Sequence, residues 1–374
     1  MNNLLDILNK SVNYLGKKNI KNARLTAESI ISEVMEMERI MLYAEFERIL
    51  SEDELKKIRE KLNDTVNNDK EISENNDFEN NEKSEKQLKL LLDKSISYLK
   101  KNNIDESKLI AEIVFSHVLN TDRMMLFTKY RDEIENEKIE KIRYFIQKIG
   151  REKFPVQYLL NEQEFYGRKF YVDKGVLIPR QDTEVLVEKM IDILKNDITK
   201  NQNSKIHPKI LDIGVGSGII GITAALEIKD SYVLGVDISE KALETAKKNK
   251  ELLKVSNIKF LKSNLFENIE FKQFDMIVSN PPYISLDEAG IMSDDTLLHE
   301  PSEALFAEND GLYFYYEICQ KALDYLADFG YLLFEIGYKQ GKNVAEIMTS
   351  SGFKNVEVIK DLAGLDRVVV GQKL

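Results

Sequence analysis

The sequence predicts an α/β fold with an open, doubly wound sheet, preceded by a region that is entirely helical. Three observations predict this architecture. Short apolar strands alternate with amphipathic helices after about residue 183, as a doubly wound sheet requires. A glycine-rich turn, Gly214 to Gly218, follows the first of these strands. Before residue 150 the apolar spacing is helical, and the same pattern occurs twice.

The alternating region contains short segments rich in β-branched and aromatic residues, which are typical of buried strands. The candidate strands are Ile210–Ile213, Tyr232–Val236, Ile258–Leu261, Met276–Ser279, Tyr331–Ile336, Val356–Ile359 and Arg367–Val370. Apolar residues at helical spacing lie between them and before them. They predict helices over Thr183–Leu194, Ile219–Ile228, Glu240–Leu253, Leu312–Leu326 and Gly341–Ser350.

The helical region contains an internal repeat. Without gaps, Leu4–Leu62 aligns with Leu88–Ile146 at a constant offset of 84 (88 − 4), and roughly a third of the positions are identical. Two copies are too few for a solenoid, so the repeat indicates a tandem duplication of one small helical domain. The apolar spacing within a copy predicts three or more short helices, for example over Leu4–Lys17, Ala23–Met35 and Glu52–Leu62.

Composition indicates where the domains begin and end. The segment between the helical copies is rich in Asn, Glu, Asp and Ser, and it cannot bury enough apolar surface to offset the entropy of ordering. We therefore expect a flexible linker there. Aromatic and β-branched residues on both sides of Tyr166-Gly167 predict a hairpin after the second copy. The predicted domains are two helical copies (1–63 and 87–150), the linker (64–86), a hairpin connection (151–178) and the α/β domain (179–374).

Composition and charge also restrict the class of function. The chain has 374 residues and a formal net charge of −11, so direct binding of a nucleic-acid backbone, which requires clustered Lys and Arg, is not expected. A single cysteine, Cys319, and three widely separated histidines show no metal-ligand spacing, so no metal site is expected. No segment has the length of a membrane span or the apolar core of a signal peptide, which predicts a cytoplasmic protein without membrane attachment.

The glycine-rich turn and the end of the next strand are typical of a site for an adenosyl group. The run Leu211-Asp212-Ile213-Gly214-Val215-Gly216-Ser217-Gly218 connects a strand to a helix, and glycines there let the backbone approach a ligand closely. Asp237 ends the following strand, where its carboxylate can accept hydrogen bonds from ribose hydroxyls. Because Gly216–Gly221 also satisfies G-x-G-x-x-G, NAD is the competing ligand.

A second motif, Asn280-Pro281-Pro282-Tyr283, follows the strand Phe274–Ser279 and is therefore expected at the ligand-binding edge of the sheet. The prolines lack N–H groups and hold their carbonyls rigidly, Asn280 adds a side-chain acceptor, and Tyr283 adds a flat ring. Together they form an acceptor-rich cradle for a planar group that bears NH2, such as an amide or a base. A nicotinamide enzyme has no evident use for this cradle, so the two motifs together favour S-adenosylmethionine over NAD.

These motifs, with others in the same order, resemble the bacterial peptide chain release factor glutamine methyltransferase family, which belongs to the class I S-adenosylmethionine-dependent methyltransferases. The second helical copy is similar to the N-terminal domain of that family, and the first copy is additional. Gln181, Asn161 and the pair Asn264-Leu265 depart from the family pattern. From Arg151 onward the resemblance includes Pro155-Val156-Gln157-Tyr158, Leu177-Ile178-Pro179-Arg180, Asn280-Pro281-Pro282-Tyr283, Glu300-Pro301, Glu335-Ile336-Gly337 and Asp366-Arg367.

The resemblance implies a Rossmann-like sheet of seven strands with the last strand antiparallel. It also implies methyl transfer from S-adenosylmethionine to the glutamine amide nitrogen in the Gly-Gly-Gln motif of class I release factors, in support of translation termination. The implied catalytic residues are Asn280, Pro281 and Tyr283, and with Pro282 they would bind the substrate amide. The implied cofactor residues are Gly214, Val215, Gly216, Ser217, Gly218, Asp237, Asn264, Leu265 and Asn280.

Other functions remain open at this point. A sister glutamine methyltransferase that acts on a ribosomal protein shares almost the whole pattern. Amino methyltransferases of RNA or DNA bases use a similar cradle, although the acidic charge disfavours them. The helical copies would also suit a binding scaffold, which the intact glycine and amide motifs disfavour. Asp212 and Glu184 are candidates either for contact with the cofactor or for structural roles.

Overall fold

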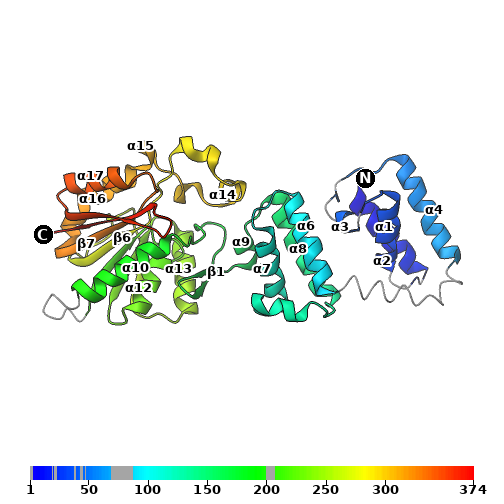
Figure 1. The fold of residues 1–374 in the computed structure, drawn as a ribbon, viewed down its shortest axis with the longest axis horizontal. Coiled ribbons are helices and arrows are strands. Elements are labelled where there is room, and N and C mark those ends of the chain that lie inside the picture. The colour runs from blue at the N-terminus through cyan, green and yellow to red at the C-terminus, as the bar shows by residue number, and fades with distance from the viewer. Residues whose placement is uncertain are drawn as a thin grey trace. The chain divides into compact units, whose positions relative to one another are not determined.

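The computed structural model of the chain describes residues 3–18, 20, 23–37, 39–42, 45–46, 48–68, 87–198 and 207–374. The chain divides into two compact units, Met1–Val156 and Gln157–Leu374, whose elements are drawn in Figure 1. In its described part, the first unit contains helices and isolated bridges only. The second unit contains a hairpin and the large sheet.

The helices of the first unit occur twice at a constant spacing. Each element of the second set begins 84 residues after its counterpart (88 − 4, 107 − 23, 123 − 39 and 136 − 52). The first set is α1 (Leu4–Lys17), α2 (Ala23–Val34), α3 (Arg39–Leu42) and α4 (Glu52–Asn68). The second set is α6 (Leu88–Lys101), α7 (Ser107–Leu119), the 3₁₀ helix η2 (Arg123–Lys129) and α8 (Asn136–Glu152).

The interiors of the two sets are built from equivalent residues. Leu15 and Leu99 are fully buried. Ser11 and Ser95 are also buried, and each hydroxyl donates to the backbone carbonyl four residues earlier, so both hydroxyls have a partner. The helices α1, α2 and α4 begin at the predicted residues. However, α4 continues to Asn68, into the segment predicted as linker. Residues 69–86 of that segment lie outside the described residues.

The predicted hairpin opens the second unit after the short helix α9 (Val156–Leu160). Its strands, β1 (Gln163–Phe165) and β2 (Arg168–Phe170), are antiparallel. Tyr166-Gly167 forms the turn with both φ angles positive, at 50° and 68°, which is the geometry that two-residue hairpin turns favour.

The large sheet has seven strands in the order β5-β4-β3-β6-β7-β9-β8. All neighbours are parallel except at β9, which is antiparallel to both β7 and β8, so the predicted antiparallel last strand is confirmed. The strands are β3 (Lys209–Ile213), β4 (Tyr232–Asp237), β5 (Ile258–Lys262), β6 (Phe274–Ser279), β7 (Leu326–Glu335), β8 (Lys354–Lys360) and β9 (Asp366–Gln372).

Helices cover both faces of this sheet (Figure 1). Along a strand, successive side chains enter opposite layers: Ile210 packs in one apolar cluster and Leu211 in the other. The central strands, such as β6 and β9, are buried on both faces and therefore consist mainly of apolar residues. One face carries α10 (Thr183–Ile193), α12 (Ile219–Glu227) and α13 (Glu240–Leu252), and the other carries α16 (Tyr313–Tyr325) and α17 (Gly341–Ser350).

Two features of the second unit were not predicted. β7 begins at Leu326, earlier than the predicted Tyr331, directly after α16 ends. The segment between β6 and α16 contains a series of helices of three to six residues, which are too short to show a repeating apolar pattern. They are η4 (Leu286–Ile291), α14 (Asp294–His299), η5 (Ser302–Ala304) and α15 (Glu308–Gly311).

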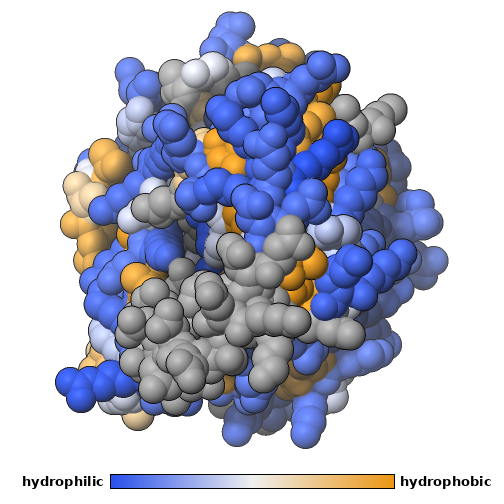
Figure 2. Space-filling model, turned by 90° about the vertical axis from the view of Figure 1, so that its right-hand side faces the viewer, coloured by the Kyte–Doolittle hydropathy of each residue, from blue (hydrophilic) through white to orange (hydrophobic). Residues whose placement is uncertain are grey.

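On the face drawn in Figure 2, hydrophilic side chains predominate and apolar residues form small, separate groups. Among the helices in the described ranges, none is both long and apolar enough to cross a membrane.

The buried amide of Asn249 joins two loops to α13. Its Oδ1 accepts from the Tyr171 N–H (2.6 Å), and its Nδ2 donates to the carbonyls of Tyr171 (2.9 Å) and Ser217 (2.8 Å). Asn249→Ala should lower the free energy of unfolding by about 2 kcal/mol, because buried backbone groups lose their partners. Urea denaturation measures this, with Lys247→Ala, an exposed position on the same helix, as the control. Equal stabilities for the two variants would contradict this role.

Candidate active site

The carboxyl ends of three parallel strands meet at one edge of the sheet. In the pairing of β3, Ile213 lies opposite Val236 of β4 and opposite Ser279 of β6. The residues that follow these strands therefore lie near one another at the edge where open α/β sheets bind ligands. This register brings the glycine-rich turn, Asp237 and the Asn280 motif together.

The glycine-rich turn has a backbone that only glycine adopts easily. Gly214, Gly216 and Gly218 have φ angles of 73°, 54° and 88°. Gly218 was predicted to bind the cofactor, but it does not line the cavity at this edge. A Cβ atom on Gly218 would lie 2.8 Å from Ile222 and 3.3 Å from Ala246, so this glycine allows α12 and α13 to pack closely.

Asp237 fastens this turn to the end of β4. Its Oδ2 accepts from the Gly216 N–H and its Oδ1 accepts from the Ser239 N–H, both at 2.9 Å. Burial raises the pKa of Asp237, and these backbone hydrogen bonds partly offset the shift. Each carboxylate oxygen keeps a further lone pair, so Asp237 can still accept hydrogen bonds from a ligand.

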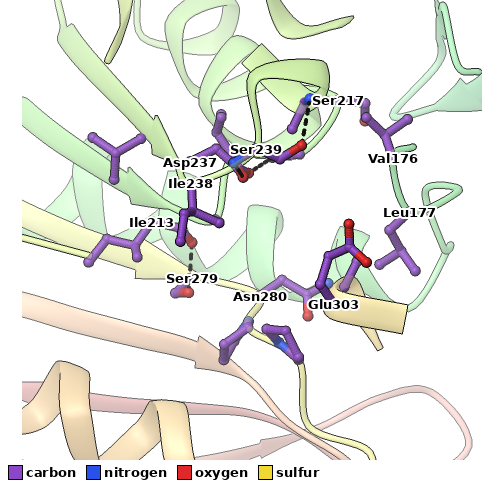
Figure 3. A pocket seen from close by; sticks show the side chains of 18 of the residues that line it. Val176, Leu177, Ile213, Ser217, Asp237, Ile238, Ser239, Ser279, Asn280 and Glu303 are labelled. Atoms are coloured by element: carbon purple, nitrogen blue, oxygen red, sulfur yellow. Dashed lines mark hydrogen bonds between the residues drawn. The ribbon is translucent and has the colours of Figure 1, made fainter. Parts of the chain in front are cut away.

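A cavity of about 410 Å³ lies between Asp237 and Asn280. Figure 3 shows these side chains on opposite sides of it, with Ser239 beside Asp237. Its walls are largely apolar and include Ile213, Ile238 and Phe314. Of the predicted cofactor residues, Gly214, Val215, Gly216, Ser217, Asp237, Asn264, Leu265 and Asn280 line this cavity.

A second cavity, of about 250 Å³, adjoins the first. Tyr283 and Glu335 line only the second, whereas Pro282 lines only the first, so the four residues of the predicted cradle divide between the two. The residues common to both cavities are Leu177, Arg180, Asn280, Pro281 and Ala304. Asn280 and Pro281 thus form part of the boundary between the cavities.

The NH2 end of the Asn280 amide is held by the hydroxyl of Thr183. Its Nδ2 donates to the Thr183 hydroxyl at 3.4 Å, and Thr183 is fully buried at the start of α10. Within the described ranges no donor reaches the Asn280 Oδ1. The side-chain oxygen is therefore available to a ligand.

An ion pair fixes the segment that covers both cavities. The Arg180 Nη2 lies 2.5 Å from the Glu300 Oε1, and the Glu300 Oε2 accepts from the Ile178 N–H at 2.9 Å. The Glu300 carboxylate is almost completely buried, while the Arg180 side chain is 41% exposed and can still reach a ligand. The pair holds Leu177 and Arg180 over the shared boundary.

A buried acid lies at the base of the second cavity. Glu335 is 1% exposed, and its Oε1 accepts from the Tyr283 hydroxyl at 3.4 Å. Burial raises the pKa of Glu335 to about 7, and the negative charge of Asp182 adds to this shift. Three groups lower the pKa and so oppose the shift: the Thr183 hydroxyl, the Arg367 guanidinium and the Tyr283 hydroxyl. The Glu335 Oε2 makes no hydrogen bond of 3.5 Å or less in the described part of the chain.

The two acids whose roles the sequence left open are structural. Asp212 is fully buried, its Oδ2 accepts from the Gly221 N–H at 2.8 Å, and burial raises its pKa to about 7. The Glu184 Oε1 accepts from the Tyr166 N–H in the hairpin turn at 2.8 Å. Neither lines either of the two cavities described above. A search of the described residues finds no cluster of three His, Cys, Asp or Glu side chains that could hold a metal.

Four residues of the site had no predicted role. The sequence contained a signal for Glu335, because an acid that ends a buried apolar strand resembles Asp237 in position. Thr183 and the pair Arg180–Glu300 gave no such signal, since their partners lie about a hundred residues away in the chain.

Comparison with known proteins gives matches to two families. Residues 180–311 match the Methyltransferase small domain. Residues 6–67 and 91–160 match the PrmC N-terminal domain, so both helical sets fall within this match.

Individual relatives match over most of the chain. The release factor glutamine methyltransferase of Fusobacterium nucleatum is 42% identical over 346 residues, which cover 92% of this chain and 94% of the relative. The enzymes of the same name from Clostridium botulinum and Thermodesulfovibrio yellowstonii are 40% and 38% identical, over 76% and 70% of this chain and 99% and 91% of theirs. On these matches, the chain belongs to the release factor glutamine methyltransferase family.

Proposed function

We propose that this chain transfers a methyl group from S-adenosylmethionine to the side-chain amide nitrogen of the glutamine in the Gly-Gly-Gln motif of class I release factors, in the cytoplasm. The observation that carries the proposal is the boundary between the two cavities. Asn280 and Pro281 face both a cavity large enough for the cofactor and a smaller one for the glutamine side chain. Family membership supports the release factor as the substrate.

The residues of the first cavity fit S-adenosylmethionine. Asp237 would accept hydrogen bonds from the ribose hydroxyls, and Gly216 allows the backbone to approach them. Ile238 and Leu265 offer apolar surfaces to the adenine, and the Asn264 amide lies at the same end. Bound there, S-adenosylmethionine supplies an electrophilic methyl group.

The second cavity fits a glutamine side chain. An amide nitrogen is a poor nucleophile, because its lone pair is delocalised into the carbonyl. The Asn280 Oδ1 and the Pro281 carbonyl would accept the two N–H groups and direct the nitrogen toward the first cavity. These acceptors also stabilise the positive charge that develops on nitrogen, so they bind the transition state more strongly than the ground state. Tyr283 and Pro282 would pack against the amide plane.

Label transfer tests the proposal directly. The full chain is incubated with methyl-labelled S-adenosylmethionine and, separately, with release factors, ribosomal proteins, RNA and DNA. We expect label only in the release factor, at the glutamine of Gly-Gly-Gln, and none in a release factor in which that glutamine is alanine. Label confined to a ribosomal protein or to nucleic acid would contradict the proposed substrate.

The cradle is tested by Asn280→Ala. This change removes an acceptor for the substrate nitrogen, so kcat should fall about a thousandfold, while the Kd for S-adenosylmethionine stays within about threefold. Steady-state kinetics and calorimetry measure the two effects. Asn268→Ala, at an exposed asparagine, is the control. Near-normal turnover in Asn280→Ala would refute the role of Asn280.

The cofactor site is tested by Asp237→Asn. An asparagine must direct its NH2 group at either the Gly216 or the Ser239 N–H, so the turn loses one of its two anchors and the ribose loses an acceptor. Calorimetry should show binding of S-adenosylmethionine weakened by about tenfold or more. Unchanged affinity in the variant, or tight binding of NAD by the wild type, would contradict the assignment.

A further inference from the structure

The cradle works only if Asn280 presents its oxygen, and not its NH2 group, to the substrate. An NH2 group facing the substrate NH2 would place donors against donors. The two ends of an asparagine amide have nearly the same shape, so neighbouring hydrogen bonds must fix its orientation. The question is which residues impose that orientation.

Thr183 is the immediate neighbour. The Asn280 Nδ2 lies 3.4 Å from the Thr183 Oγ1, and Thr183 has no exposed surface, so water does not reach it as an alternative partner. A hydroxyl carries one proton and can also accept. Thr183 accepts from the Asn280 NH2 when its own proton points elsewhere. If that proton pointed at Asn280, the amide would turn its oxygen toward Thr183.

Glu335 is the group toward which that proton can point. An ionised carboxylate only accepts hydrogen bonds. The Tyr283 hydroxyl donates to its Oε1 at 3.4 Å, and the Thr183 hydroxyl is close enough to lower the pKa of Glu335. The Glu335 Oε2 is buried and accepts no hydrogen bond from Thr183 or from any other donor in the described ranges. It therefore has room for one more donor, and a small adjustment of the Thr183 hydroxyl would let it donate there.

We propose that Glu335, acting through Thr183, fixes the orientation of Asn280 and is thereby a positioning residue for methyl transfer. This inference rests on the proposed function. An acceptor at Glu335 draws the proton of Thr183, Thr183 then accepts from the Asn280 Nδ2, and the Asn280 Oδ1 faces the substrate. In Glu335→Gln, which has nearly the same shape, the new NH2 group can donate to Thr183. Thr183 then donates to the Asn280 Oδ1, and the Asn280 NH2 group faces the substrate.

Protonation of Glu335 should have the same effect as Glu335→Gln. The groups around the carboxyl are Tyr283, Arg367, Asp182 and Tyr315, whose hydroxyl donates to the Glu335 backbone carbonyl at 3.0 Å. Because the pKa of Glu335 is raised to about 7, kcat of the wild type should fall as the pH decreases from 8 to 6. Asp212 has a pKa raised to a similar value, so Asp212→Asn serves to separate its contribution.

The test compares Thr183→Val, Thr183→Ser and Glu335→Gln in the full chain. We expect kcat to fall about tenfold or more in Thr183→Val and Glu335→Gln, with the Kd for S-adenosylmethionine and the Tm close to wild type. Thr183→Ser, which keeps the hydroxyl, should recover kcat to within about threefold. The fall of kcat below pH 7 should persist in Asp212→Asn and disappear in Glu335→Gln. Thr349→Val and Glu346→Gln, at exposed positions of α17, are the matched controls.

A second measurement does not depend on turnover. In protein labelled with ¹⁵N-asparagine, the side-chain NH2 signals of Asn280 are identified by their loss in Asn280→Asp. They should shift in Thr183→Val and Glu335→Gln and stay unchanged in the α17 controls. Unshifted signals, or equal kcat in Thr183→Val and Thr183→Ser, would overturn the inference. A wild type that fails to methylate release factor would refute the proposed function alone, because the NMR result still decides the role of Glu335.

Discussion

The register of β3 with its two parallel neighbours is the constraint on which the site depends. Ile213 lies opposite both Val236 and Ser279, so the three strands end together. A shift of one residue in either pairing would turn the side chains of that strand to the opposite layer. Such a shift is opposed because it would move the side chains of one layer into spaces that are closely packed for the side chains of the other. The apolar core thus fixes the position of the polar residues at the edge.

The same core contains two buried acids, whose effect on the free energy of unfolding depends on pH. Burial raises the pKa of Asp212 and of Glu335 from ordinary values of 3.8 and 4.5 to about 7. Between about pH 4 and pH 7 the folded chain keeps protons that the unfolded chain releases. The free energy of unfolding therefore decreases, through these two groups, as the pH rises across that window, and their contribution is constant above it. Asp212 anchors the start of α12, and Glu335 lines the second cavity, so both acids lie near the edge of the sheet that carries the two cavities.

The repeated helical sets show which features packing constrains. Leu15 and Leu99 are equally buried, but the glutamates at the equivalent positions 28 and 112 differ in their burial and in their ion pairs. Glu28 is 2% exposed and lies 3.2 Å from Arg39, whereas Glu112 is partly exposed and pairs with Lys108 at 3.9 Å. The buried apolar positions are therefore kept in both sets, while the ion pairs made by the equivalent glutamates differ.

The sequence by itself determined the longer helices, the strands, the hairpin and the two ligand motifs, because each of these leaves a local pattern. Apolar periodicity marks the elements, the glycines mark a turn that needs positive φ, and the prolines after β6 mark rigid carbonyls. Only the tertiary structure decided that Gly218 packs against α13 instead of lining the cavity, and that Thr183 lies beneath Asn280. It also decided that Glu335 faces the second cavity and that Glu300 holds Arg180 over it. These contacts join residues from about thirty to more than a hundred positions apart, and the strand register that brings them together is set by burial of the whole sheet.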